Sequence, residues 1–364
     1  MPLFIFVTII FLFLNLGDIV TPLTVQEAFV QGAYLVWLDG LQMDSGSSAK
    51  NIKSFQALCE QKMLSLLGSS ASVINSDPTL EDTQEKLIVK PFAINKNKDR
   101  QAEPKYIFYT KTTTNNVLKI LRALQIQKPI LLEGSPGIGK SSLVEALAKK
   151  IGQPLVRINL SDQTDISDLF GSDLPVEGGA VGQFAWRNGP FLDALQNGDW
   201  ILLDELNLAS QSVLEGLNAV FDHRGEVYIP ELDLTFPLNP NTRVFGCQNP
   251  LSEGGDRKGL PKSFLNRFSK VYMSGLTPED YKLICLTLHP ELGQELVDKL
   301  VEFNQILDEQ IVVQRKWGQS GAPWEFNLRD LLRWCDAIKG EAMEDMEEIK
   351  LEPGKFVNIL YASR

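Results

Sequence analysis

Short apolar runs alternate with amphipathic stretches through the middle of the chain. The runs fall within residues 129–132, 154–160, 200–205, 242–249 and 270–273. Glycine, proline or helical stretches separate them, and none exceeds about six apolar residues. Continuous runs of this length are typical of strands buried on both faces, and strands that alternate with helices usually form a parallel sheet. The pattern therefore predicts an α/β fold, with a parallel five-stranded sheet between helices.

Stretches with helical periodicity accompany these runs. Residues 112–125 and 141–151 predict helices beside the sheet. From residue 277 to residue 340 the pattern is helical throughout. The helical spacing of four apolar residues predicts one buried face on a helix of this region: Leu296, Leu300, Phe303 and Leu307. We therefore expect a small all-helical domain after the α/β domain.

The N-terminal third has a different organisation. Residues 25–41 and 55–67 predict helices, whereas residues 68–85 and 90–105 are polar and rich in turn formers, which indicates a linker. The predicted divisions are a helical segment over 1–70, a linker over 71–104, the α/β domain over 105–276, the helical domain over 277–340 and an acidic segment over 341–364.

A nearly unbroken apolar run covers residues 3–14 and is followed by Asn15 and Asp18. It is shorter than the roughly 20 residues that a membrane-spanning helix needs. It also lacks the positively charged n-region and the small-residue cleavage site of a secretory signal. A buried segment is the favoured interpretation, with a signal or a membrane anchor as the alternative.

Composition narrows the possible functions. Lys and Arg number 35 and Asp and Glu number 46, which gives a net charge of −11. A nucleic-acid-binding protein needs a basic face that displaces counterions, so general nucleic-acid binding is disfavoured. The four cysteines lie far apart without a CxxC pair, and there are two histidines. A disulfide framework or a zinc site is therefore not expected, and a reducing compartment fits best.

The strongest chemical motif lies between the first apolar run and the helix that follows it. Residues 134–141 read GSPGIGKS and fit GxxxxGK[ST] in the strand–loop–helix context that this motif requires. Its glycines let backbone N–H groups surround an anion, and the helix N-terminus adds a positive dipole. The predicted nucleotide-binding residues are Gly134, Ser135, Pro136, Gly137, Ile138, Gly139, Lys140, Ser141 and Ser142. We expect Lys140 to reach the β- and γ-phosphates of ATP and Ser141 to bind Mg²⁺.

Two carboxylates, Asp204 and Glu205, follow the apolar run WILL. Ligands of open α/β sheets bind at the carboxyl ends of the strands, where these two side chains emerge. Asp204 fits a magnesium partner, and Glu205 fits the base that orients or deprotonates water. Two acids at this position predict hydrolysis rather than transfer to a substrate hydroxyl.

Three further polar residues are candidates for the same site. Asn249 ends the strand RVFGCQ, and its amide is suited to bind attacking water or the γ-phosphate. Arg267 lies at a predicted helix end, and Arg329 opens a helix of the predicted helical domain. Arginine suits developing phosphoryl charge because its planar group donates several hydrogen bonds. From the residues alone, a surface ion pair explains either arginine equally well.

Five segments together resemble the AAA+ ATPases. They are GSPGIGKS, ILLDELNLASQSVLEGLN, HRGEVYIPELD, FGCQNP and LPKSFLNRF, and they occur in this order within residues 105–340. Their number and order make the resemblance more specific than any single motif. Within the AAA+ ATPases the chain is similar to the MoxR-like branch, and in particular to the midasin family of very large, dynein-related ATPases of ribosome assembly.

The resemblance assigns roles to the candidate residues. It implies that Asn249 is sensor 1, that Arg329 is the sensor 2 arginine acting in cis, and that Arg267 is the arginine finger acting in trans on a neighbouring module's nucleotide. It also implies that residues 172–191 are the helix-2 insert and residues 226–241 the pre-sensor-1 hairpin.

The resemblance also implies a larger assembly. Residues 25–41 look like the end of a preceding AAA+ lid, and midasin-like proteins carry six modules in one chain, so we expect a fragment with one complete module. The implied partners are neighbouring AAA+ modules in a ring, pre-60S ribosomal particles and assembly factors. The implied location is the nucleus, in nucleolus and nucleoplasm. Sequence-specific nucleic-acid binding and membrane association are not expected.

Two functions follow from these features. The first is Mg²⁺-dependent ATP hydrolysis, which the resemblance links to remodelling and release of assembly factors in 60S biogenesis and nuclear export. The alternative is a nucleotide-binding interaction module of a larger ring with little hydrolysis of its own. The intact Glu205 and Asn249 favour the first, and the missing neighbouring modules favour the second.

Overall fold

The chain folds into two compact units. The computed structural model describes residues 23–41, 55, 57–62, 65, 78–175, 184–221, 225–229, 232–250, 259–314, 316 and 326–344. The first unit extends to Ser274 apart from residues 110–113 and 136–138, which group with the second unit, and the second unit continues from Gly275. The division lies close to the boundary expected at residue 276.

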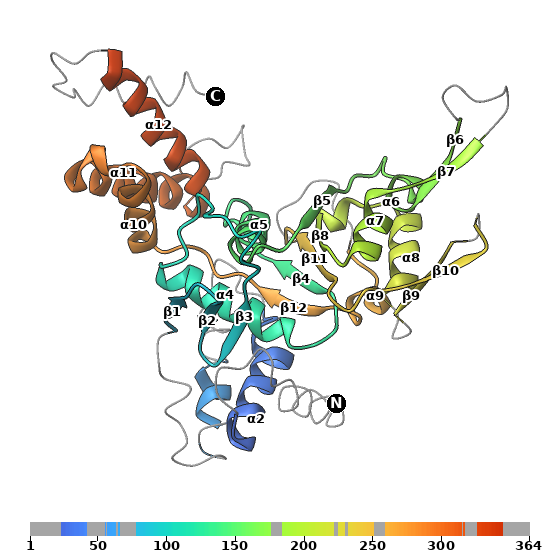
Figure 1. Cartoon of the computed structure of the whole chain (residues 1–364). Coiled ribbons are helices and arrows are strands. Elements are labelled where there is room, and N and C mark those ends of the chain that lie inside the picture. Colours follow the sequence, from blue (N-terminus) through green and yellow to red (C-terminus); the bar gives the residue numbers. More distant parts are fainter. Residues whose placement is uncertain are drawn as a thin grey trace. The chain divides into compact units, whose positions relative to one another are not determined.

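A five-stranded parallel sheet forms the centre of the first unit (Figure 1). Its strands are β4 (Ile130–Glu133), β5 (Leu155–Asn159), β8 (Trp200–Asp204), β11 (Arg243–Gln248) and β12 (Ser269–Tyr272). Their order is β12-β4-β11-β8-β5, and each neighbouring pair is parallel. All five residues of β8 are buried, as expected for a strand covered on both faces. The predicted α/β fold is confirmed.

Helices pack around this sheet and complete the core. They are α4 (Lys111–Leu124), α5 (Lys140–Ile151), α6 (Ile166–Phe170), α7 (Pro190–Asn197), α8 (Gln211–Val220) and α9 (Lys262–Leu265). Helix α5 contacts β5, β8 and β11, and α7 contacts β5 and β8. Phe170 of α6 packs against Phe191 of α7, and Phe221, which follows α8, packs against Phe264 of α9. The apolar faces that the periodicity predicts are therefore buried against the sheet and between neighbouring helices.

Two antiparallel hairpins interrupt the α/β pattern. Strands β6 (Gly171–Pro175) and β7 (Phe184–Asn188) pair within the expected helix-2 insert, and β9 (Glu226–Ile229) and β10 (Leu234–Pro237) pair within the segment expected to be a hairpin. Phe184 and Tyr228 are exposed on them. In the second hairpin, the residues of β9 alternate between exposed and buried, in agreement with the alternating pattern of its sequence.

Residues 80–95 form a three-stranded antiparallel sheet within the segment for which a linker was expected. Its strands are β1 (Leu80–Asp82), β2 (Lys86–Val89) and β3 (Phe92–Asn95). The side chains of Leu87, Val89 and Phe92 are fully buried. The strands contribute few apolar side chains each, so their pattern does not stand out from the polar residues around them.

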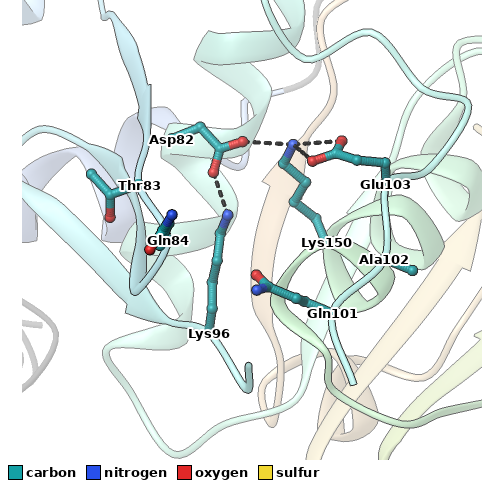
Figure 2. Close-up of a pocket in the computed structure, with 8 residues that line it drawn as sticks. All are labelled: Asp82, Thr83, Gln84, Lys96, Gln101, Ala102, Glu103 and Lys150. Atoms are coloured by element: carbon teal, nitrogen blue, oxygen red, sulfur yellow. Dashed lines mark hydrogen bonds and ion pairs between the residues drawn. The ribbon is translucent and has the colours of Figure 1, made fainter. Parts of the chain in front are cut away.

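Ion pairs made by two buried lysine side chains attach this small sheet to α5. The Asp82 carboxylate pairs with Lys96 and with Lys150, and Lys150 also contacts Glu103 at 2.7 Å (Figure 2). The Lys96 and Lys150 side chains are only 5% and 6% exposed. With neighbouring polar side chains they line a pocket of about 380 Å³. Lys96, which we expected to be solvated in a linker, instead belongs to a buried polar cluster.

The N-terminal helical segment is attached to the α/β domain through Arg122 of α4. Its described elements include α2 (Val25–Ala33) and the π-helical turn η1 (Tyr34–Leu38), and residues 57–62, within the helix predicted over 55–67, are also helical. Arg122 donates hydrogen bonds to Gln31, at 2.8 Å, and to the Asp39 carboxylate, and its guanidinium lies 4.8 Å from the centre of the Tyr34 ring. The Arg122 and Asp39 side chains are 5% and 3% exposed. The attachment is therefore a buried ion pair with satisfied hydrogen bonds.

The second unit is helical, as expected. Its elements are α10 (Pro278–Leu288), η5 (Pro290–Leu292), α11 (Gln294–Leu307), η6 (Asp308–Val313) and α12 (Leu328–Glu344). The buried face of α11 consists of Val297, Leu300, Val301 and Asn304. Phe303, which was predicted to lie on the buried face, is 37% exposed. Both faces of α11 carry apolar residues at helical spacing. Packing against α10 and α12 determines which of the two faces is buried.

Within the described part of the chain, no helix has the length and apolar character required to cross a bilayer. The apolar run at residues 3–14 lies outside the described residues. Of the acidic segment predicted over 341–364, residues 341–344 belong to α12 and the rest lie outside the described residues.

Replacing Arg122 with methionine should lower the free energy of unfolding by about 3–5 kcal/mol, because the Asp39 carboxylate would remain buried without its partner. Urea unfolding followed by circular dichroism measures this loss. The double variant Arg122→Met/Asp39→Asn is the control and should recover part of the stability, since it buries no unpaired charge. A loss under about 1 kcal/mol, the range of exposed pairs, would contradict the assignment.

The Asp82 cluster predicts a pH-dependent contribution to stability. Burial raises the pKa of Asp82, but the hydrogen bonds and charges of Lys150 and Lys96 outweigh it and hold the pKa below its usual range. A carboxyl with a lowered pKa stabilises the fold above its unfolded pKa and loses this effect as the pH falls through its folded pKa. Asp82→Asn should therefore be less stable than the parent chain at pH 7, and the difference should shrink below about pH 4.

Urea midpoints of the two chains between pH 3 and pH 7 test this expectation. Glu81→Gln is the matched control, because Glu81 lies on the same strand in an exposed pair with Lys90 and should change the midpoint little at any pH. A difference between Asp82→Asn and the parent chain that stays constant across the range would contradict the role of the charged carboxylate.

Candidate nucleotide-binding site

The predicted phosphate-binding loop connects β4 to α5. Strand β4 ends at Glu133 and helix α5 begins at Lys140, so residues 134–139 form the loop. Gly139 is the N-cap of α5 and has φ 85°, a conformation that favours glycine. Ser141 and Ser142 follow in the first helical turn, at the positive end of the helix dipole. This is the local geometry that an anion-binding loop requires.

The ammonium group of Lys140 is buried at the centre of the site. Lys140 is 8% exposed, and its Nζ donates to the carbonyl oxygens of Gly134, at 2.6 Å, and Ser135, at 2.9 Å. It also donates to Oδ1 of Asn249, at 2.7 Å. Lys140 and Asn249 are 109 residues apart in the chain, so the fold brings together two residues that the sequence assigned separately to the same site.

Asp204 and Glu205 lie at the carboxyl end of β8, as predicted. Glu205 has φ 54°, in the left-handed region that a residue with a side chain seldom adopts. Its Oε1 accepts a hydrogen bond from Nδ2 of Asn249 at 3.3 Å. Its Oε2 is buried and has no hydrogen-bond partner among the described residues. The left-handed turn therefore directs a carboxylate oxygen with unused acceptor capacity into the protein.

Asn249 follows β11 and joins the two motifs. It is 7% exposed, accepts from Lys140 and donates to Glu205, so its amide orientation is determined from both sides. Asn207, which is not among the predicted site residues, donates from Nδ2 to the backbone oxygen of Asn249 at 3.0 Å. Its own Oδ1 is buried without a partner among the described residues. The only sequence signal for Asn207 is its position, three residues after Asp204.

A second residue missed from the sequence is Arg157, on β5. It donates from Nη2 to Oδ2 of Asp204 at 2.6 Å and from Nη1 to Oε1 of Glu145 at 2.9 Å. Burial lowers the pKa of Arg157, but the charges of Asp204 and Glu145 outweigh it and raise the pKa above its usual range. The guanidinium is therefore a fixed positive charge beside the predicted magnesium partner.

The donor set at the end of the sheet fits Mg²⁺. The candidates are the Ser141 hydroxyl and the Asp204 carboxylate, and magnesium prefers such oxygen ligands, with phosphate and water oxygens completing its shell. No group of three or more His, Cys, Asp or Glu side chains in the described chain is placed to hold a metal ion. Magnesium in proteins is commonly held by one or two protein oxygens, with phosphate and water oxygens as its other ligands.

The two candidate arginines lie in different units. Arg267 follows α9 in the first unit and donates from Nε to Oδ1 of Asn218, on α8, at 2.6 Å. Arg329 is exposed in the first turn of α12 in the second unit, where its backbone N–H donates to the Asn327 side chain. Their roles as arginine finger and sensor 2 remain predictions.

Comparisons with known proteins agree with the geometry. Residues 129–268 match the model of the AAA domain of the dynein-related subfamily, and residues 280–364 match the model of the midasin AAA lid domain. The first match contains the loop, both carboxylates, Asn249 and Arg267, and the second contains Arg329.

Proteins with similar sequences include two midasins. The chain is 44% identical over 370 residues to midasin of Dictyostelium discoideum, a match that covers 97% of this chain and 6% of that protein. It is 50% identical over 227 residues to midasin of Giardia intestinalis, covering 62% of this chain and 5% of that protein. An uncharacterized protein of Staphylococcus aureus (strain USA300) is 26% identical over 231 residues, which are 63% of this chain and 85% of that protein.

The chain thus spans only a small part of the length of the midasins that it matches. Over that part, an AAA domain is followed by the lid domain characteristic of midasin. The chain belongs to the midasin family of dynein-related AAA ATPases.

Proposed function

We propose that this chain binds Mg·ATP at the β4–α5 loop and hydrolyses it. The observation that carries the proposal is the hydrogen-bonded series Lys140–Asn249–Glu205, which joins the loop, the strand end after β11 and the acidic strand end after β8. An ATPase needs these three groups to act on one phosphate. The same series would have no evident use in a protein that binds no anion.

Each residue has a chemical task in the proposed reaction. Lys140 exchanges its carbonyl acceptors for phosphate oxygens, while Ser141 and Asp204 provide ligands for magnesium. The free Oε2 of Glu205 accepts a proton from the attacking water. Asn249, bound to Oε1 of Glu205, orients that water toward the γ-phosphate. Magnesium supplies charge neutralisation on the phosphates.

The proposal extends to an assembly. Arg267 acts in trans on nucleotide held by a neighbouring AAA module, and Arg329 acts in cis from the lid. By resemblance to midasins, the ring that results remodels and releases assembly factors from pre-60S particles in the nucleus. This part rests on resemblance, since fold alone does not determine a substrate.

A second function is favoured by one observation. The guanidinium of Arg267 is bound to Asn218 of its own domain. If neighbouring modules do not recruit it, the chain would bind nucleotide as an interaction module with little hydrolysis.

Lys140→Ala should weaken ATP binding by about 10-fold or more, because the charged hydrogen bonds to phosphate are lost. Titration with a fluorescent ATP analogue measures the affinity. Lys149→Ala is the matched control, since Lys149 is exposed on the same helix and should leave the affinity unchanged. Equal affinities for the parent chain and Lys140→Ala would remove the loop from the phosphate site.

Glu205→Gln should retain ATP binding and lower turnover by about 100-fold or more, because the amide keeps the shape of the side chain but cannot accept a proton. Steady-state phosphate release, measured at several protein concentrations, tests this. A parent rate per chain that rises with concentration supports completion of the site by a neighbouring Arg267. A rate near zero at every concentration, with ATP still bound, would favour the interaction module instead.

A further inference from the structure

Arg157 holds one oxygen of the predicted magnesium ligand. Strand β5 lies beside β8, with Arg157 opposite Leu202 and Asn159 opposite Asp204. From this position the Arg157 guanidinium reaches Oδ2 of Asp204 at 2.6 Å. The Asp204 side chain is only 12% exposed, whereas that of Arg157 is 46% exposed. The carboxylate is thus fixed in the protein, and the guanidinium is the more mobile partner of the pair.

Both oxygens of Asp204 already have partners within the chain. Oδ2 accepts from Arg157, and Oδ1 accepts from the backbone N–H of Glu205 at 3.2 Å. The Glu205 N–H is a neutral donor in the backbone, whereas Arg157 carries a full positive charge. A divalent cation approaching Asp204 is therefore repelled by Arg157 and competes with it for the same carboxylate.

Glu145 offers Arg157 a second place to bind. It lies on α5, its side chain is 39% exposed, and its Oε1 accepts from Nη1 of Arg157 at 2.9 Å. A guanidinium that releases Asp204 therefore keeps an acidic partner. The cost of releasing Asp204 is small as a result, since the charge stays paired and partly solvated.

We propose that Arg157 is an internal competitor for magnesium at Asp204, which raises the magnesium concentration needed to fill the nucleotide site. The inference rests on the proposed nucleotide-binding function. It assigns Arg157 a positioning role, because the residue acts through Asp204 rather than on the nucleotide. In the absence of magnesium Arg157 binds both Asp204 and Glu145, and in its presence it releases Asp204 and keeps Glu145.

The test is a magnesium titration of nucleotide binding. A fluorescent ADP analogue is held at a fixed concentration with the full chain, and bound nucleotide is followed as Mg²⁺ is added from zero, starting in EDTA. Arg157→Gln should shift the midpoint to a lower magnesium concentration by about three- to fivefold, the range of a partly exposed charge pair. Its nucleotide affinity in EDTA should equal that of the parent chain within about twofold.

Three further variants isolate the cause. Arg157→Lys keeps the charge but loses the planar donor group, so a smaller shift in the same direction is expected. Arg187→Gln removes an exposed arginine from β7 and controls for net charge, with no shift expected. Glu145→Gln removes the alternative partner, so its midpoint should equal that of the parent chain or rise.

The outcomes separate this inference from the function on which it rests. A parent chain that binds no nucleotide, with or without magnesium, overturns the proposed function. If the parent chain binds, an unchanged midpoint in Arg157→Gln makes Arg157 a surface ion pair and overturns the inference. A raised midpoint also overturns it, because Arg157 would then prepare Asp204 for magnesium. Thermal unfolding of each variant verifies its fold, and Arg157→Lys provides the test if the glutamine variant is unstable.

Discussion

The parallel pairing of β11 with β4 on one side and β8 on the other is the constraint on which the candidate site depends. Because the strands run in one direction, the loop after β4, the carboxylates after β8 and the amide after β11 emerge at the same edge of the sheet. In an antiparallel arrangement at least one of them would lie at the opposite edge. All five residues of β8 are buried, which fixes the register of this strand in the sheet. A shifted register would move its apolar side chains out of the core and toward the polar residues at the strand end.

The site combines satisfied and unsatisfied polar groups. Asn249 is bound on both sides, and its backbone is held by Asn207. In contrast, Oε2 of Glu205 and Oδ1 of Asn207 are buried without partners among the described residues. An unsatisfied buried acceptor costs stability, on the order of 1–3 kcal/mol, and proteins retain such groups where function needs them. An unpaired carboxylate oxygen beside an amide that is bound on both sides is the arrangement that the proposed hydrolysis requires.

How far the sequence predicts the molecule depends on how local each signal is. The loop ending in Lys140 and the strand ending in Asp204 are contiguous patterns, so both could be located without a structure. Arg157 could not, because its partner Asp204 lies 47 residues away and one arginine in a strand has no pattern. The sheet over residues 80–95 was missed for a different reason. Its strands are three or four residues long, too short for alternation to outweigh the polar turns around them.

That small sheet has a physical connection to the loop. Helix α5 begins at Lys140. Two contacts hold its other end: the backbone N–H of Asn97 donates to the Ile151 oxygen at 2.7 Å, and Lys150 pairs with Asp82. Gly152, which ends the helix, has φ 74°, and a Cβ there would lie 2.6 Å from the Asn97 oxygen. The helix is thus held at the end far from Lys140. If ATP binds as proposed, the loop over residues 134–139 can therefore change conformation more easily than α5 can shift.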